Sequence, residues 1–267
     1  MKIELWIDTK CRLEKEEQEY IESLREILPV VMMSDIPGSI DFAVDENVKR
    51  EQNIKNQEYA VYLGDDSQRI RQMKKRGYPV IAYLREDMPI DVSPYAVESL
   101  LALDEEYLTR VYCHSKGIPQ VITSTDRLII REMAMTDLDA LLEIYETNEI
   151  TPFFQTFYDN REEAAAYLAD YIKNVYDFYG FGIWGICLKE NSNAAGEGQE
   201  GQTVELSVQC PMIGIIGLTP REGALELGYA LAKAYQGKKY IVEARKAMIE
   251  YGRKKLGNDK IIEITNR

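Results

Sequence analysis

The sequence has one histidine and four cysteines, and neither residue type occurs in a spacing that metal sites use. His114 stands in the stretch VYCHSKG, so a zinc site with two histidines is excluded and a Ser-His triad would depend on this residue alone. A single histidine outside such a constellation is typical of a structural position. The cysteines form no Cys-x-x-Cys pair, which argues against a zinc site and a disulfide framework and favours a reducing cytoplasm. We therefore expect no metal site and a cytoplasmic location.

Long apolar segments are absent as well. No run of eighteen apolar residues occurs, and the first residues, MKIELWIDTK, lack the apolar stretch of a secretory signal. The net charge of −13 argues against a general nucleic-acid partner. A length of 267 residues suits two modest domains or one large one. The composition thus predicts a globular protein that binds neither membranes nor nucleic acids.

The charge is distributed unevenly along the chain. Residues 126–232 hold six Lys or Arg against eighteen Asp or Glu, a balance of −12. Residues 233–267 hold ten against four, a balance of +6. A solvated basic helix would explain the second segment. An anion-binding surface would explain it too, because the segment begins with a candidate phosphate-binding loop.

The clearest pattern in the first half runs from Tyr59 to Tyr83. An apolar strand is followed by a turn with a helix cap, a short helix that ends at Gly77, and a second apolar strand. The corresponding segments are Ala60–Leu63, Gly64-Asp65-Asp66-Ser67, the helix around Ile70 and Met73, and Pro79–Tyr83. Strand, helix and strand within some 25 residues predict a parallel βαβ unit. Around it we expect a strand at Leu28–Met33 and a closing helical region at Val97–Val111.

A boundary is predicted at Gly117–Thr125, where Gly, Pro, Ser and Thr interrupt the periodic pattern. Beyond it the patterns predict five strands and three helices. The expected strands are Arg127–Met133, Ile183–Leu188, Met212–Leu218, Ala224–Leu231 and Lys260–Thr265. The expected helices begin at a Thr136-Asp137 cap and cover Arg161–Tyr179 and Ile241–Leu256. Asn191–Gln202, rich in Asn, Gly, Gln and Ser, is expected to be a hairpin loop without a catalytic part.

The segment from Leu225 to Ala244 carries the predicted chemistry. The strand LELGYAL runs through a short loop, QGKKYI, into the basic helix. A helix start offers free backbone N–H groups and the positive end of the helix dipole, which together favour an anion. Lys238 and Lys239 add two positive charges there.

These residues, in this order, resemble the GNAT N-acetyltransferases, and most of all the branch that acetylates ribosomal-protein amino termini. Thr125–Arg131 resembles the opening strand of that branch, and Glu226-Leu227-Gly228-Tyr229 resembles its central strand. The loop resembles the family's Gln-x-x-Gly-x-Ala diphosphate motif, and Asp259–Asn266 resembles the strand after the main helix. The resemblance covers residues 125–267.

The resemblance implies an α/β (α+β) fold in which a partial parallel α/β domain precedes a GNAT-type mixed sheet flanked by helices. It implies that acetyl-CoA is the co-substrate and that a primary amine, on a small molecule or at a peptide amino terminus, attacks its thioester directly. The pantetheine arm would pair with backbone at the end of the central strand, and the diphosphate would accept backbone N–H groups of the loop. The implied cofactor-binding residues are Tyr229, Ala230, Leu231, Ala232, Gln236, Gly237, Lys238, Lys239, Tyr240 and Ile241.

The sequence departs from the family pattern at two loop positions. Lys239 stands where the family has glycine, and Ile241 where it usually has alanine. Small residues there let backbone approach the diphosphate closely. The family also continues with a further helix and strand, so the resemblance implies a carboxyl-terminally incomplete fold. These departures favour an alternative, a non-catalytic acyl-CoA-binding or regulatory module.

Glu226 is the candidate catalytic base, because several relatives place a glutamate there facing the acceptor amine. The other reading is an ion-paired strand carboxylate. Tyr229 would line the acceptor side or pack within the sheet. An aromatic group would chiefly fill the core and otherwise wall the acceptor pocket. Its members are Tyr176, Phe178, Tyr179, Phe181 and Trp184.

Tyr59–Tyr83 also resembles the later part of haloacid-dehalogenase-type phosphohydrolases, where a Gly-Asp-Asp turn holds Mg²⁺. That family's nucleophile lies in an Asp-x-Asp at the end of an apolar strand. The chain has only Asp137-Leu138-Asp139, at a predicted helix start in the other half. We therefore interpret residues 1–118 as a partial hydrolase-like domain that is not catalytic and serves packing or regulation.

Overall fold

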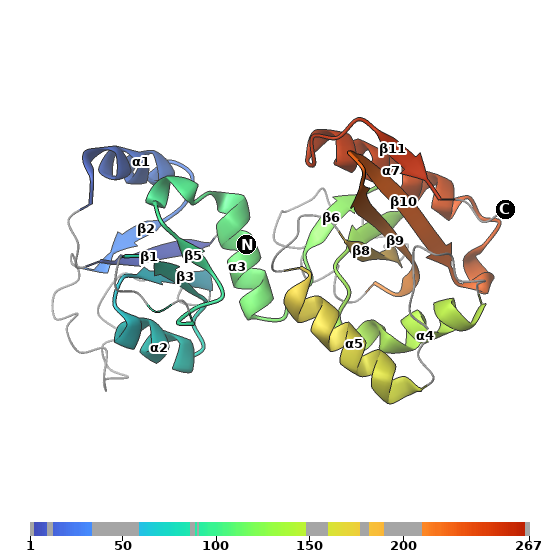
Figure 1. Cartoon of the computed structure of the whole chain (residues 1–267), viewed down its shortest axis with the longest axis horizontal. Helices are drawn as coiled ribbons and strands as arrows, with labels where there is room; N and C mark the ends of the chain where they lie inside the picture. Colours follow the sequence, from blue (N-terminus) through green and yellow to red (C-terminus); the bar gives the residue numbers. More distant parts are fainter. Residues whose placement is uncertain are drawn as a thin grey trace. The chain divides into compact units, whose positions relative to one another are not determined.

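The structure is a computed structural model that describes residues 3–9, 13–33, 59–85, 89, 91–147, 160–176, 182–189 and 210–264. The chain forms two compact units, Met1–Gly117 and Ile118–Arg267, each built around its own sheet (Figure 1). No helix in the described ranges is long and apolar enough to cross a membrane.

The first unit contains a parallel sheet of five strands in the order β2-β1-β3-β4-β5. The strands are β1 (Glu4–Asp8), β2 (Val30–Met32), β3 (Ala60–Gly64), β4 (Val80–Tyr83) and β5 (Ala96–Val97). The helices are α1 (Lys15–Arg25), α2 (Ser67–Lys75) and α3 (Glu105–Ser115), with a 3₁₀ turn η4 (Leu100–Ala102). β3 and β4 are buried along their whole length, as a parallel sheet covered on both faces requires.

The predicted βαβ unit is confirmed. β3 and β4 are parallel neighbours, and α2 begins where Asp66 accepts the N–H groups of Gln68 and Arg69. The helix ends before Gly77, whose φ of 82° is the left-handed conformation that favours glycine. The closing helical region expected at Val97–Val111 is present as η4 and α3, while Val97 itself ends β5. Ser99 caps the short turn η4, and Asp104 caps α3, so two caps divide that region.

The second unit contains six strands in the order β11-β10-β9-β8-β7-β6. They are β6 (Val121–Ser124), β7 (Leu128–Arg131), β8 (Ile183–Leu188), β9 (Met212–Arg221), β10 (Ala224–Leu231) and β11 (Ile261–Glu263). All neighbours are antiparallel except β10 and β11, which are parallel. The predicted fold class, a parallel sheet followed by a mixed sheet, is confirmed.

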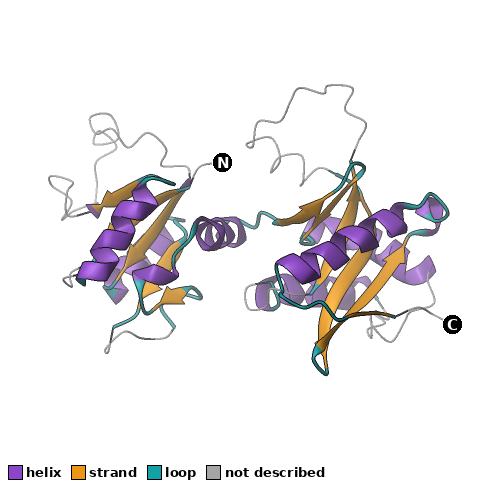
Figure 2. Ribbon diagram, turned by 90° about the horizontal axis from the view of Figure 1, so that it is seen from above, coloured by secondary structure: helices purple, strands orange, loops and turns teal. Residues whose placement is uncertain are grey.

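The helices of this unit lie on both faces of its sheet (Figure 2). They are α4 (Leu138–Thr147), α5 (Arg161–Asn174) and α7 (Tyr240–Lys254), with 3₁₀ turns η5 (Met135–Asp137) and η6 (Lys233–Tyr235). α7 crosses one face, where Gly252 lies against Leu218, Leu225 and Ile261. α4 and α5 pack together on the other face. Alternate residues of each strand therefore face α7 or the α4–α5 layer.

Two local expectations differ in detail from the structure, and a third falls on residues that the structure does not describe. The Gly117–Thr125 boundary contains the edge strand β6, so it is not a plain linker. Asp137 does not cap α4 but lies inside η5, where its carboxylate accepts the N–H of Ala134 and pairs with Arg131. The Asn191–Gln202 loop lies outside the described residues.

Candidate active site

Among the described residues, β11 pairs only with the first half of β10. The N–H of Leu225 donates to Lys260 (2.8 Å), and the N–H of Ile264 donates to the carbonyl of Leu227 (3.0 Å). These bonds show that odd-numbered residues of β10 direct their backbone groups toward β11. Tyr229 is the next odd residue, one step beyond the last described bond to β11. Among the described residues, none pairs with its backbone groups on the β11 side.

β10 leads through η6 into the loop at the start of α7. Lys239 occupies the N-cap position without a side-chain cap. Among the described residues, no acceptor takes the N–H groups of Lys239, Tyr240 or Ile241. Gly237 has φ 74° and Lys239 has φ 64°, so two left-handed residues shape this loop. N–H groups without a described acceptor at the positive end of a 15-residue helix are the geometry on which the predicted anion site depends.

The loop is fastened to β10 and carries positive charge. The side-chain amide of Gln236 donates to the carbonyl of Leu231 (3.0 Å), which closes the turn between strand and helix. Lys238 and Lys239 are exposed, and the ammonium of Lys238 lies 5.3 Å from the ring centre of Tyr235. The predicted cofactor residues from Tyr229 to Ile241 therefore lie on one continuous stretch of chain, from the second half of β10 to the start of α7.

Glu226 lies on the first half of β10, opposite Thr219 of β9. Its side chain is 15% exposed, and one oxygen accepts a 2.8 Å bond from Arg221, a residue of the same hairpin. This is the ion-paired arrangement that was the other reading of Glu226. Five residues of strand separate Glu226 from Leu231, about 17 Å. Glu226 thus lies near the start of β10, whereas the loop Gln236–Ile241 follows the other end of that strand.

Tyr229 and Glu226 are not brought together. Their spacing of three residues places the two side chains on opposite faces of the sheet. Tyr229 is half-buried on the α7 face, with the guanidinium of Arg245 5.5 Å from its ring centre. Arg245 also pairs with Glu263 of β11. Of the aromatic group, Tyr176 and Trp184 are buried in the core, and the other three members lie outside the described residues.

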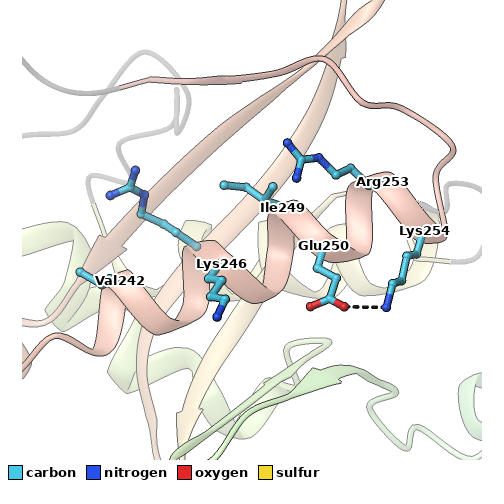
Figure 3. Close-up of a pocket in the computed structure, with 7 residues that line it drawn as sticks. Val242, Lys246, Ile249, Glu250, Arg253 and Lys254 are labelled. Carbon is cyan, nitrogen blue, oxygen red and sulfur yellow. Dashed lines mark hydrogen bonds and ion pairs between the residues drawn. The ribbon is translucent and has the colours of Figure 1, made fainter.

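A shallow groove of about 540 Å³ runs along the outer side of α7 (Figure 3). Val242 and Ile249 form its apolar part, and four cationic side chains with one glutamate form its rim. The cationic residues are Arg245, Lys246, Arg253 and Lys254, and Glu250 pairs with Lys254. The +6 segment therefore presents its charge along α7, starting at the diphosphate loop.

The first unit brings together carboxylates that the sequence pattern did not connect. Asp8 ends β1 and lies beside Gly64, the last residue of β3, so Asp8 and Asp65 meet at one edge of the sheet. Asp8 accepts bonds from Tyr62 (2.6 Å) and Arg69 (3.1 Å), and Thr9 donates to Asp65. Within the described ranges, no group of three or more His, Cys, Asp or Glu could hold a metal ion.

Comparison with known proteins identifies the second unit. Residues 127–267 match the model of the acetyltransferase (GNAT) domain. This is more than half of the chain, so the chain belongs to the GNAT acetyltransferase family. It is an N-acetyltransferase, and acetyl-CoA is the acetyl donor of that family. The residues on the second half of β10 and at the helix start fit such a donor, because they offer backbone groups for its amides and N–H groups for its diphosphate.

Solved structures with a similar fold include three acetyltransferases. One, of the GNAT family from Bacillus anthracis, is 18% identical over 55% of this chain and 72% of its own, with a TM-score of 0.37. Another, from Salmonella typhimurium, modifies the amino-terminal serine of a 50S ribosomal subunit protein; it is 16% identical over 54% and 74% (TM-score 0.36). A ribosomal-protein alpha-N-acetyltransferase in complex with coenzyme A is 15% identical over 54% and 73% (TM-score 0.38). No curated protein matches the sequence.

Lys239→Gly is expected to raise the free energy of unfolding of the second unit by about 0.5–1 kcal/mol. The left-handed conformation costs a non-glycine residue about 1–2 kcal/mol, and the greater freedom of glycine in the unfolded chain returns part of this. Denaturant unfolding followed by Trp184 fluorescence, in a Trp6→Phe background, measures the change. Lys238→Gly is the matched control and should lower stability, because Lys238 does not adopt a positive φ. Equal losses in both variants would contradict the interpretation.

Proposed function

We propose that this chain transfers an acetyl group from acetyl-CoA to a primary amine, on a small molecule or at a peptide amino terminus, by direct attack on the thioester. The observation that carries the proposal is a continuous stretch of chain from Tyr229 to Ile241. Within the described ranges, no residue pairs with the backbone of Tyr229 on the β11 side or accepts the N–H groups of Lys239, Tyr240 and Ile241. Acetyl-CoA supplies the activated acetyl group. The amine nitrogen forms the new bond to the acetyl carbon, and the bond to sulfur breaks.

The residues of this stretch would divide the binding of the donor between them. Within Tyr229–Ala232, the backbone groups of Tyr229 and Leu231 would pair with the pantetheine amides, because those of Ala230 and Ala232 point toward β9. The N–H groups from Gly237 to Ile241 would hold the diphosphate, with Lys238 and Lys239 screening its charge.

Glu226 would remove the proton that the attacking ammonium must lose. Its carboxylate is mostly buried and has one oxygen engaged by Arg221, which fixes its position. The −12 balance of residues 126–232 would favour approach of a cationic amine, and the +6 balance of residues 233–267 would favour the phosphorylated donor.

The first unit would take no part in this reaction. We propose that residues 1–118 are a non-catalytic domain, as the sequence predicts. The haloacid-dehalogenase resemblance has no support from the comparisons, which match the family only from residue 127 onward. Asp8 pairs with Arg69 and accepts a hydrogen bond from Tyr62. The chain continues Asp8-Thr9-Lys10, so Asp8 does not begin an Asp-x-Asp motif.

A non-catalytic acyl-CoA-binding module is the second candidate. The left-handed Lys239 favours it, because a lysine in the family's glycine position obstructs close approach of backbone to the diphosphate. Such a module would bind acetyl-CoA without acetylating any amine. Membership of an acetyltransferase family favours the enzyme. Steady-state rates with small primary amines and with peptides that have a free amino terminus separate the two candidates.

Gly237→Pro is expected to weaken acetyl-CoA binding about tenfold or more. Proline removes one N–H donor and cannot adopt the φ of 74° that this position requires. Equilibrium titration, repeated at increasing salt, should show binding that weakens with salt in the wild type, as for a charged ligand. Gly237→Asn is the control, since asparagine keeps the N–H and tolerates left-handed backbone. Unchanged affinity in the proline variant would exclude this loop as the diphosphate site.

A further inference from the structure

The turn before β7 is a rigid structure that faces the start of α7. The N–H of Thr125 donates to the carbonyl of Leu128 (2.9 Å), and the N–H of Leu128 donates back to the Thr125 hydroxyl (3.0 Å). The same hydroxyl donates to Glu243, in the first turns of α7. The turn is therefore closed on itself and fastened to the helix.

Arg127 extends from this turn and contacts the loop Gln236–Ile241 at Lys238 and Tyr240, and α7 at Glu243. The Nε and one Nη of its guanidinium donate to one carboxylate oxygen of Glu243 (2.8 and 2.7 Å), and its backbone N–H donates to the other oxygen (3.0 Å). One Nη donates to the carbonyl of Lys238 (3.3 Å). Its guanidinium carbon lies 4.6 Å from the ring centre of Tyr240. A single side chain thus joins the peptide before the N-cap, the first helical residue and the first turns of α7.

The contact with the Lys238 carbonyl fixes a second group. In a planar trans peptide the carbonyl of Lys238 and the N–H of Lys239 point in opposite directions. When Arg127 holds the carbonyl, the N–H of Lys239 must point away from Arg127. This N–H is one of those that no described residue accepts. It belongs to the peptide that places Lys239 at φ 64°, a conformation that lysine adopts only when its surroundings enforce it.

We propose that Arg127 is a positioning residue that fixes the diphosphate loop in its binding conformation and thereby compensates for lysine at position 239, an inference that rests on the proposed function. Preorganisation of this kind improves affinity because the loop does not have to be ordered when the ligand binds. A glycine at position 239 would adopt the same backbone without a clamp.

We call the contacts of Arg127 with Glu243 and with the Lys238 carbonyl the clamp. Glu243 supplies the negative charge of this clamp. Burial works against ionisation of its carboxyl, but bonds from the Thr125 hydroxyl and from the backbone and guanidinium of Arg127 outweigh burial, and its pKa lies below the ordinary value. Glu243 is therefore ionised at neutral pH, and the bond to the Arg127 guanidinium is charge-assisted.

Arg127→Ala is expected to raise the dissociation constant and the KM for acetyl-CoA about tenfold, the size expected when a charge-assisted bond that preorganises a loop is removed. The kcat at saturating acetyl-CoA and the KM for the amine should stay within about twofold of the wild-type values. The reason is that Arg127 contacts Lys238, Tyr240 and Glu243, and does not contact Glu226, the proposed base. A general loss of structure would change all of these constants together. Arg161→Ala is the control, since Arg161 makes an exposed ion pair with Asp139 on the other side of the sheet.

Two further variants test whether the shape of the Arg127 side chain matters and whether Arg127 is needed only because position 239 is a lysine. Arg127→Lys keeps the charge but cannot reach Glu243 and the Lys238 carbonyl together, so it should weaken binding about threefold or more. In a Lys239→Gly background, Arg127→Ala should have a smaller effect on affinity than in the wild type. The slope of affinity against salt should stay unchanged in Arg127→Ala, because Arg127 does not contact the diphosphate.

Three results would overturn the proposal. Wild-type affinity in Arg127→Ala or Arg127→Lys would show that the clamp is not needed. A reduced salt slope in Arg127→Ala would show direct electrostatic contact instead of positioning. Failure of the wild-type chain to bind acetyl-CoA would remove the proposed function and this inference together, whereas normal wild-type binding with an unaffected Arg127→Ala variant would remove only the inference.

Discussion

Asp137→Ala lowers the free energy of unfolding of the second unit by about 3–5 kcal/mol, the largest stability effect that we expect from a single substitution. Arg131 and Asp137 form a buried ion pair in which both side chains are nearly inaccessible, at 1% and 7% exposed. The two guanidinium–carboxylate bonds measure 2.7 and 2.9 Å. Removal of Asp137 leaves a buried guanidinium without its counter-charge and the N–H of Ala134 without its acceptor.

The neighbouring ion pair provides the control. Asp139 pairs with Arg161 at the surface, where the two side chains are 78% and 57% exposed, so Asp139→Ala should leave the unfolding midpoint unchanged. The double variant Arg131→Met with Asp137→Leu should recover most of the loss, because apolar residues of similar volume need no counter-charge. Denaturant unfolding followed by Trp184 fluorescence measures all three. Equal effects of Asp137→Ala and Asp139→Ala would contradict the role of burial.

Glu226→Gln lowers turnover by about 10²-fold or more while acetyl-CoA binding stays normal, if Glu226 is the base. Glutamine keeps nearly the same shape and removes the basic oxygen. The measurement is the rate against pH, from 6 to 9, with a small primary amine and with a peptide that has a free amino terminus. Acetyl-CoA affinity, measured by titration, shows whether the binding site has remained intact.

Arg221→Ala separates the two readings of Glu226. It removes the ion pair but keeps the carboxylate, so a catalytic Glu226 predicts far smaller losses of turnover in Arg221→Ala than in Glu226→Gln. If Glu226 only stabilises the hairpin, both variants should lose similar stability and neither should lose turnover specifically. A rate unchanged by Glu226→Gln across the pH range would assign Glu226 to the structural role.

The elements were largely predictable because their patterns are local. The strands Ile183–Leu188 and Ala224–Leu231 were predicted residue for residue, since turn residues bound both apolar runs. The predicted Ile241–Leu256 helix differs from α7 by one or two residues at each end. The closing helical region at Val97–Val111 was predicted, but its division into η4 and α3 was not, because Leu100 and Leu103 show helical spacing although they lie in and beside a separate capped turn.

Part of the candidate site follows the same logic. The loop Gln236–Ile241 was identified from contiguous residues, and the structure places these residues at a helix start. Arg127 was seen only as part of an opening strand, because 111 residues separate it from Lys238, the carbonyl that it binds. A contact between residues so far apart leaves no periodic signal in a single sequence. The pairing of Glu226 with Arg221 across a hairpin was foreseen only as one of two readings.

The sequence by itself predicted, through its resemblance, that residues 125–267 form an acetyltransferase domain. It also predicted an anion site at the start of a basic helix, because strand, loop and helix are adjacent in the chain. Only the tertiary structure decided what surrounds that site. It set the register in which the described part of β11 pairs with β10 as far as Leu227, the faces that separate Tyr229 from Glu226, and the clamp of Arg127 on the loop. These properties depend on strand pairing and on packing between distant segments, and a local pattern of residues does not specify either.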